Sequence, residues 1–147
     1  MKKLWSCVTD WTVSWWLAGH LDSVPTARHL TRATLVGWGL AGEPVDIAEL
    51  LVSELVGNAV EYSRGRIRLS LAIRGGTLRV EVEDGNPEMP HLRHADVYDE
   101  AGRGLFLVDA LSQRWGGGST PRGKAVWFEL PTTGEMARAP GPHMALA

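Results

Sequence analysis

The chain has 147 residues, of which 44% are apolar and 22% are charged, and its net charge is −2. These values fit one soluble globular domain with a single core, and they exclude a strongly basic nucleic-acid-binding chain. The single cysteine, Cys7, excludes an internal disulfide and a zinc site built on several cysteines.

No uninterrupted apolar run approaches the roughly 20 residues that cross a bilayer. The N-terminal stretch "MKKLWSCVTDWTVSWW" has two lysines before apolar residues, but Asp10 and two threonines interrupt it, so we interpret it as mature protein. We therefore expect a cytoplasmic protein with neither a membrane nor a nucleic acid as a direct partner.

The first half of the chain predicts one strand and two helices. Residues 10–18 are rich in β-branched and aromatic residues, which favours a strand. Residues 22–40 begin with capping candidates, have Pro25 near the first turn and reach glycines at the end, which is typical of a helix. Residues 44–63 predict a second helix, again opened by a proline.

A β-hairpin follows the second helix. Residues 66–74 and 77–84 each alternate polar and apolar side chains, and Gly75-Gly76 lies between them. Alternating runs joined by two glycines predict antiparallel strands with a tight turn.

The second half begins with residues 85–104, which have no period and contain two prolines and three glycines. A loop near twenty residues long inside a compact domain is uncommon and often functional. The remaining segments predict a helix over 104–115 (or a short strand over 114–116 at its end), a turn over 116–123, a strand over 124–131 and a flexible tail over 132–147.

This order of elements predicts a two-layer α/β sandwich. Strands joined by hairpins give a mixed, mostly antiparallel sheet, and about three amphipathic helices need one face of it to bury their apolar stripes. We expect residues 1–131 to form this single domain.

The helix over 44–63 carries Glu54 and Asn58, which fall about 40° apart on a helical wheel, at the edge of the apolar stripe. Burying an unpaired carboxylate is unfavourable, so Glu54 needs a partner or water. One reading is an ion pair with Arg66 or Arg68 of the sheet, and the other is a pocket between helix and sheet.

The strand over 77–84 ends in Asp84, and Gly85 then allows a sharp turn of the backbone. A carboxylate at a strand end that opens a long loop can accept a hydrogen bond from a ligand amine. The alternative is a structural Asp-Gly turn.

Gly102, Arg103 and Gly104 lie where the long loop meets a helix. Backbone N–H groups at a helix start suit a phosphate, and an arginine adds charge-assisted contacts. The alternative is a flexible helix start.

Two further patterns have simpler readings. "GSTPRGKA", residues 118–125, imitates a P-loop but precedes a strand and has Ala125 in place of the hydroxyl residue, so we reject it, while expecting Lys124 to reach a phosphate. His91 and His94 fit a solvated loop better than a metal pair.

The seven tryptophans favour core and core-edge packing. A partner-binding patch is the alternative, because Trp is enriched at interface hot spots. Four of the seven cluster near the N-terminus, at Trp5, Trp11, Trp15 and Trp16.

Four stretches, "SELVGNAVEYS", "VEDGNPEMP", "GRGLFLVDALSQRWG" and "GKAVWFELP", resemble in this order the motifs of the Bergerat-fold ATPases, the GHKL superfamily. Within it the chain is most similar to short histidine-kinase-like ATP-binding proteins of actinobacteria and to anti-sigma-factor serine kinases. The resemblance covers roughly residues 10–131.

The resemblance implies a role for each candidate residue. Asn58 would ligate the Mg²⁺ that bridges the ATP phosphates, and Glu54 would act as general base. Asp84, with Gly85, would bind the adenine. The remaining candidates would lie along the phosphates: Gly102, Arg103, Gly104 and Lys124.

The function implied is an ATP- and Mg²⁺-dependent protein serine/threonine kinase. Such a protein acts as an anti-sigma factor, binding a sigma factor and phosphorylating an anti-sigma-antagonist protein, and a homodimer is expected by analogy. The alternative is a non-catalytic partner-binding module that uses ATP structurally or has lost nucleotide binding.

Overall fold

The computed structural model describes residues 10–63, 65–88 and 100–133 and the pair 143–144, with residues 100–103 and 143–144 described by their backbone. The elements follow the chain in the order β1 Trp11–Leu17, α2 Ser23–Gly37, α3 Glu43–Tyr62, β2 Ile67–Arg74, β3 Thr77–Asp84, α4 Glu100–Leu111, β4 Arg114–Ser119, β5 Lys124–Pro131 and β6 His143–Met144.

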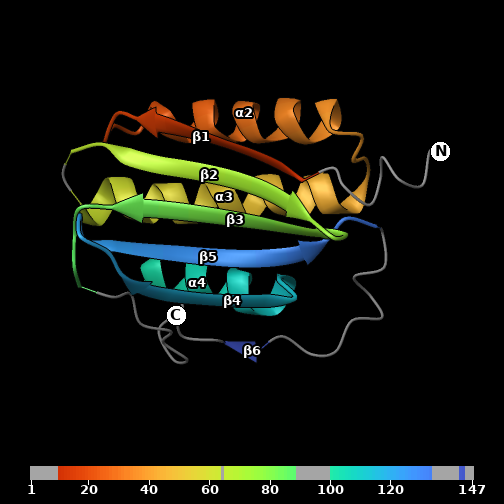
Figure 1. The fold of residues 1–147 in the computed structure, drawn as a ribbon. Helices are drawn as coiled ribbons and strands as arrows, with labels where there is room; N and C mark the ends of the chain where they lie inside the picture. Colours follow the sequence, from red (N-terminus) through yellow and green to blue (C-terminus); the bar gives the residue numbers. More distant parts are fainter. Residues whose placement is uncertain (1–9, 64, 89–99, 134–142, 145–147) are drawn as a thin grey trace.

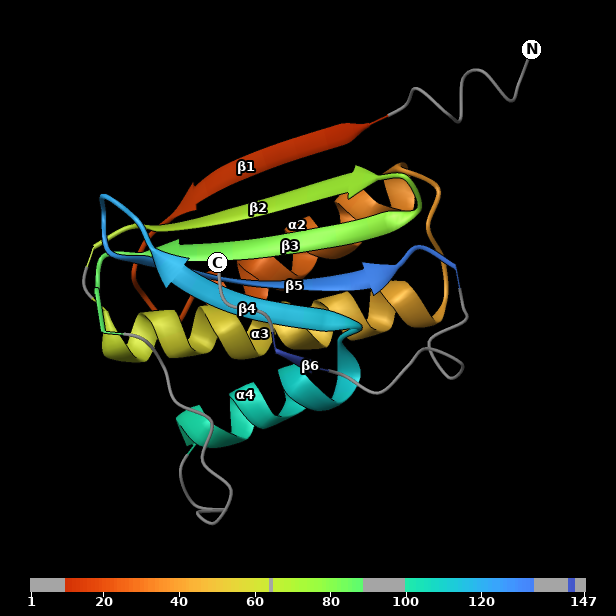
Figure 2. The ribbon, with the colours of Figure 1, turned by 60° about the horizontal axis from the view of Figure 1, so that its bottom comes forward.

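The strands form one sheet in the order β1-β2-β3-β5-β4-β6. Neighbours from β1 to β4 are antiparallel, and β6 is parallel to β4. Figures 1 and 2 show α2, α3 and α4 on one face of this sheet, and no helix of the described residues lies on the other face. The predicted two-layer sandwich with a mixed, mostly antiparallel sheet is confirmed.

The central hairpin follows directly from its sequence pattern. Buried and less buried residues alternate along β2 and β3. Gly75 and Gly76 have φ values of 54° and 81°, so both occupy the left-handed region that a two-residue hairpin turn requires. The turn thus fixes the register that puts the buried apolar residues of both strands on the helix side, whereas Ala72 lies on the other face.

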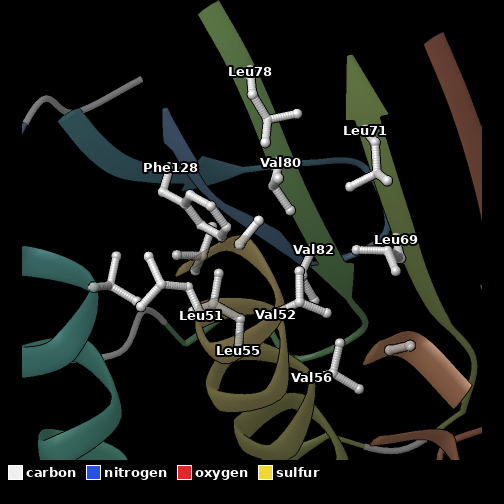
Figure 3. Close-up of a cluster of buried hydrophobic side chains, with 14 of the residues drawn as sticks. Leu51, Val52, Leu55, Val56, Leu69, Leu71, Leu78, Val80, Val82 and Phe128 are labelled. Atoms are coloured by element: carbon white, nitrogen blue, oxygen red, sulfur yellow. The ribbon is translucent and has the colours of Figure 1, made fainter. Parts of the chain in front are cut away.

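The core lies between α3 and the middle of the sheet. Figure 3 shows side chains of α3 pointing toward the inner residues of β2 and β3, with Phe128 of β5 beside them. These side chains are all buried: Leu51, Val52, Leu55, Val56, Leu69, Leu71, Leu78, Val80, Val82 and Phe128.

Arg32 connects α2 to α3. Its guanidinium donates to Asp46 at 2.6 Å and to Glu49 at 2.5 Å. These hydrogen bonds to two carboxylates raise the pKa of Arg32. The contact holds the two helices side by side on the sheet.

The third helix differs from its predicted bounds, because it begins at Glu100 rather than at residue 104 and ends at Leu111 rather than at 115. Its end is set by pairing in the sheet. Gln113 donates its N–H to Glu129 in β5, and Trp115 pairs with Phe128 and is buried. This long-range pairing overrides the local helical pattern of residues 112–115.

The predicted turn over 116–123 is also too long. The three glycines at 116–118 belong to β4, which extends well beyond the short strand considered at 114–116. They pair with residues 125–127 of β5, and the turn is reduced to residues 120–123, where Thr120 and Gly123 exchange backbone hydrogen bonds.

Most of the predicted flexible tail over 132–147 lies outside the described residues, which here include only 132–133 and 143–144. The pair His143–Met144 forms β6, which pairs with Arg114 and Trp115 of β4. In the described part of the chain, no helix combines the length and apolarity needed to span a membrane.

The tryptophans divide between core and surface. Trp115 and Trp127 are buried, and Trp11 stacks on Trp38 with ring centroids 5.6 Å apart. Trp15 is half-buried against the core, whereas Trp5 lies outside the described residues.

Trp16 is different, because 44% of it is exposed. The guanidiniums of Arg66, Arg68 and Arg122 lie 4.6, 5.6 and 4.5 Å from its ring centre. The prediction that the tryptophans pack in or beside the core therefore holds for some of the seven. Trp16 and the three arginines form a surface cluster, the Trp16 cluster, on the face of the sheet opposite the helices.

Candidate functional site

Glu54, Asn58 and Gly104 come together where α3 meets α4, and we call them the α3–α4 cluster. A Cβ added to Gly104 would lie 3.1 Å from Asn58 Nδ2 and 3.2 Å from Glu54 Oε1. The bare backbone of α4 therefore lies directly against the two polar groups that the sequence singled out. Any side chain at position 104 would enter the space beside them.

The burial pattern of α3 places this pair at the edge of its apolar stripe. Leu51, Leu55 and Ala59 are buried, while Glu54 and Asn58 are half-buried. This confirms the position predicted from the helical wheel.

The alternative ion pair of Glu54 is not formed. Arg66 and Arg68 lie over Trp16 instead. Among the residues that the structure describes, the side chains of Glu54 and Asn58 have no hydrogen bond or ion pair. A carboxylate and a carboxamide that have no partner in the described part of the chain, and that lie beside a bare backbone, are suited to a ligand.

A second group, which we call the Asp84 cluster, consists of Asp84, Gly85, Asn86, Gly123 and Lys124. Asp84 is only 4% exposed. Its Oδ1 accepts hydrogen bonds from Asn86 N at 2.8 Å and from Lys124 Nζ at 2.9 Å. Lys124 Nζ also donates to Asn86 O at 3.1 Å. The carboxylate is thus fixed by a ring of contacts at the end of β3.

The Asp84 cluster is fastened to the C-terminal end of α3. Gly85 N donates to Ser63 Oγ at 3.1 Å, and Asn86 Nδ2 donates to Tyr62 O at 2.8 Å. Tyr62 lies four residues after Asn58, so about 6 Å of helical rise separates them. The helix that carries Glu54 and Asn58 therefore also anchors the Asp84 cluster.

Gly123 packs against the strand end without any room for a side chain. Its added Cβ would lie 2.4 Å from Asp84 O and 2.8 Å from Gly85 Cα. The backbone bends at Gly85 directly after β3, as predicted, although Gly85 is not among the glycines with positive φ. Position 123 therefore needs a glycine, because it packs directly against the backbone of Asp84 and Gly85.

Asn86 and Gly123 were missed by the sequence reasoning. Asn86 also accepts a hydrogen bond from Glu88 N at 3.0 Å, so both its backbone and its side chain shape the segment. The Asn-Pro pair at 86–87 is a turn signal that could have indicated it. Gly123 has no comparable signal, because its neighbours come from a distant strand.

Gly102 and Arg103 lie in the first turn of α4 rather than before it. The side chain of Arg103 and the pair His91 and His94 lie outside the described residues. In the part of the chain that is described, no group of three or more His, Cys, Asp or Glu side chains is placed to hold a metal ion. An ion at the α3–α4 cluster would need oxygen ligands from a bound molecule as well.

Residues 17–130 match the histidine kinase-like ATPase domain family. The chain belongs to this family. The match runs from the last residue of β1 into β5 and includes both clusters. Membership implies binding of ATP, for which Mg²⁺ is the common companion ion.

A relative in Streptomyces coelicolor, the uncharacterized protein SCO4941, is 48% identical over 52 residues. The aligned part is 34% of this chain and 49% of the relative, so the match spans about half the relative's length.

The residues present fit Mg-ATP. The α3–α4 cluster offers an amide oxygen and a carboxylate beside glycine backbone, and hard cations prefer such oxygen ligands. The Asp84 cluster offers a fixed, buried carboxylate that can accept from an amino group. The α3–α4 cluster lies along the second half of α3 and the Asp84 cluster is anchored at its C-terminal end, so the two could contact different parts of one extended nucleotide.

Proposed function

We propose that this chain is a cytoplasmic ATP-binding regulatory protein with Mg²⁺-dependent protein serine/threonine kinase activity. Its proposed role is that of an anti-sigma factor that phosphorylates an anti-sigma-antagonist protein. The α3–α4 cluster carries the proposal, because Glu54 and Asn58 lie one turn apart against Gly104 without another partner among the described residues.

Asn58 is proposed to hold Mg²⁺ through its amide oxygen, since its position on a packed helix fixes that oxygen. Mg²⁺, when bound, supplies charge neutralisation at the phosphates. Glu54 is proposed to accept the proton of the attacking serine hydroxyl. A carboxylate one helical turn from the metal ligand can come within hydrogen-bond reach of a hydroxyl that attacks the metal-bound phosphate.

The remaining residues are proposed to position the nucleotide. Asp84 accepts from the adenine amino group, and Gly85 keeps the strand end narrow. Gly102, Arg103 and Gly104 lie along the phosphates at the start of α4, where backbone N–H groups and a guanidinium favour anionic oxygen atoms. Lys124 was predicted to contact a phosphate, but its hydrogen bond to Asp84 favours a position at the adenine end of the nucleotide.

Calorimetry with ATP, with and without Mg²⁺, tests the binding part of this proposal. Wild type should bind Mg-ATP more tightly than ATP alone, and Asn58→Ala should lose that difference while still binding ATP. Asp109→Asn is a control on α4 that alters a carboxylate bonded to Trp115 Nε1 rather than the cluster. Equal Mg²⁺ dependence in wild type and Asn58→Ala would refute the metal assignment.

Transfer of labelled phosphate to candidate antagonist proteins tests the catalytic part. Glu54→Gln keeps the size of the side chain but removes the base, so transfer should fall about 10²–10⁴-fold while Mg-ATP binding persists. Undiminished transfer by Glu54→Gln would show that another group accepts the proton.

A partner-binding module that holds ATP structurally is the second candidate. The Trp16 cluster favours it, because an exposed indole with three guanidiniums combines the residue types enriched at interface hot spots. Mg-ATP binding with no phosphate transfer to any candidate would favour this module. A homodimer remains part of the proposal, and sedimentation with and without ATP tests it.

A further inference from the structure

Lys124 is buried in an unusual way for a lysine. Only 9% of its side chain is exposed, and its ammonium lies 2.9 Å from Asp84 Oδ1. Removing an ammonium group from water is unfavourable unless its charge and all its donors are compensated. Asp84 compensates the charge.

The donors of Lys124 are compensated only in part. An ammonium group has three N–H donors. Two of them meet Asp84 Oδ1 and Asn86 O, and no third acceptor for the group lies among the residues that the structure describes. One donor of a group that is nine-tenths buried is thus available to a ligand.

The position of Lys124 places this donor at the base end of the site. Lys124 is the register partner of Asp84 across β3 and β5, and both side chains are on the helix side of the sheet. The adjoining segment bonds to Tyr62 and Ser63, one turn beyond Asn58. The ammonium is therefore held at the carboxylate rather than at the metal ligand.

We propose that Lys124 reads the adenine ring by donating its third N–H to N1, while Asp84 accepts from the neighbouring 6-amino group. This inference rests on the proposed nucleotide binding. The Asp84–Lys124 pair presents an acceptor beside a donor, and the Watson–Crick edge of adenine presents a donor beside an acceptor. Lys124 is then a specificity-determining residue in addition to fixing the position of the Asp84 carboxylate through its hydrogen bond.

Analogues of ATP test this in the wild-type chain. Mg-1-deaza-ATP lacks the N1 acceptor and would leave a buried N–H unsatisfied, so calorimetry should show about 10- to 100-fold weaker binding than for Mg-ATP. Mg-7-deaza-ATP is the matched control, since it lacks a different ring nitrogen and should bind about as tightly as Mg-ATP.

The outcomes separate the two proposals. If Mg-ATP does not bind at all, the proposed function fails and this inference fails with it. If Mg-ATP binds but the 1-deaza analogue binds equally well, the proposed function stands and the reading of N1 is wrong. A loss confined to the 7-deaza analogue would also overturn the assignment.

Lys124→Met keeps most of the apolar stem and removes the donors. Its ratio of Kd for Mg-1-deaza-ATP to Kd for Mg-ATP should fall to about 1, whereas a purely structural role would weaken both ligands alike and preserve the ratio. Thermal unfolding checks that the variant is folded, because it leaves Asp84 buried without its cation. Lys124→Arg keeps the charge beside Asp84, and it is a second variant in which the same ratio is measured.

Discussion

Gly104→Ala tests whether the α3–α4 cluster binds nucleotide, because it should weaken Mg-ATP binding while changing the stability of the fold only modestly. A helical Gly→Ala change favours the helix by about 1 kcal/mol. Here, however, the new methyl would lie 3.1 Å from Asn58 Nδ2 and 3.2 Å from Glu54 Oε1, so both side chains must move by a few tenths of an ångström. The substitution thus adds helix propensity while displacing the two proposed ligand-binding groups.

The magnitude follows from these opposing effects. Forcing a side chain off its preferred rotamer costs about 0.5–1.5 kcal/mol, and two side chains are affected. Together these costs, about 1–3 kcal/mol, equal or exceed the gain in helix propensity, so the free energy of unfolding should fall by no more than about 2 kcal/mol. Binding of Mg-ATP should weaken at least tenfold, which corresponds to about 1.4 kcal/mol.

Denaturant unfolding measures the first quantity and calorimetry the second. Gly37→Ala is the matched control, because Gly37 ends α2 and a Cβ there meets nothing within 4 Å. The control should be at least as stable as wild type and should bind Mg-ATP equally well. If Gly104→Ala also bound Mg-ATP as tightly as wild type, the contact between α4 and α3 would not belong to the nucleotide site.

Three further changes test the packing around the two clusters. Gly123→Ala should lower the free energy of unfolding by about 1–3 kcal/mol in denaturant titrations, since its Cβ would meet backbone atoms of Asp84 and Gly85 that cannot rotate away; unchanged stability would contradict this packing. Phe128→Ala should lower it by about 3–5 kcal/mol, because this ring is fully buried, and a loss under 1 kcal/mol would argue against its place in the core. Trp16→Ala should reduce stability by about 1–2 kcal/mol through lost contacts with three guanidiniums, measured by thermal unfolding at low salt, with Trp11→Ala as a comparison on the same strand.

Features encoded by local sequence were the ones that could be predicted. The alternation along β2 and β3 and the two glycines between them specify the hairpin without reference to the rest of the chain. The position of Glu54 and Asn58 at the edge of the apolar stripe follows from helical geometry alone.

Features set by pairing between distant strands could not be predicted. Residues 112–118 read locally as the end of a helix and a glycine turn, but pairing with β5 makes most of them strand. The ion pair between Lys124 and Asp84 depends on the register of β3 with β5, and the two residues are 40 positions apart in the chain. Nothing in either segment alone specifies that register, so Lys124 was predicted to contact a phosphate instead.

The common element behind both clusters is α3. Glu54, Asn58 and Tyr62 follow at intervals of four residues, so they lie near one side of the helix and span about 12 Å of rise. The first two carry the proposed base and metal ligand, and the backbone of the third anchors the segment that holds Asp84. The distance between the proposed phosphate end and the proposed base end of the site is therefore set by α3, whose position is fixed by the core shown in Figure 3. A short domain can thus position both ends of the proposed nucleotide site through a single helix.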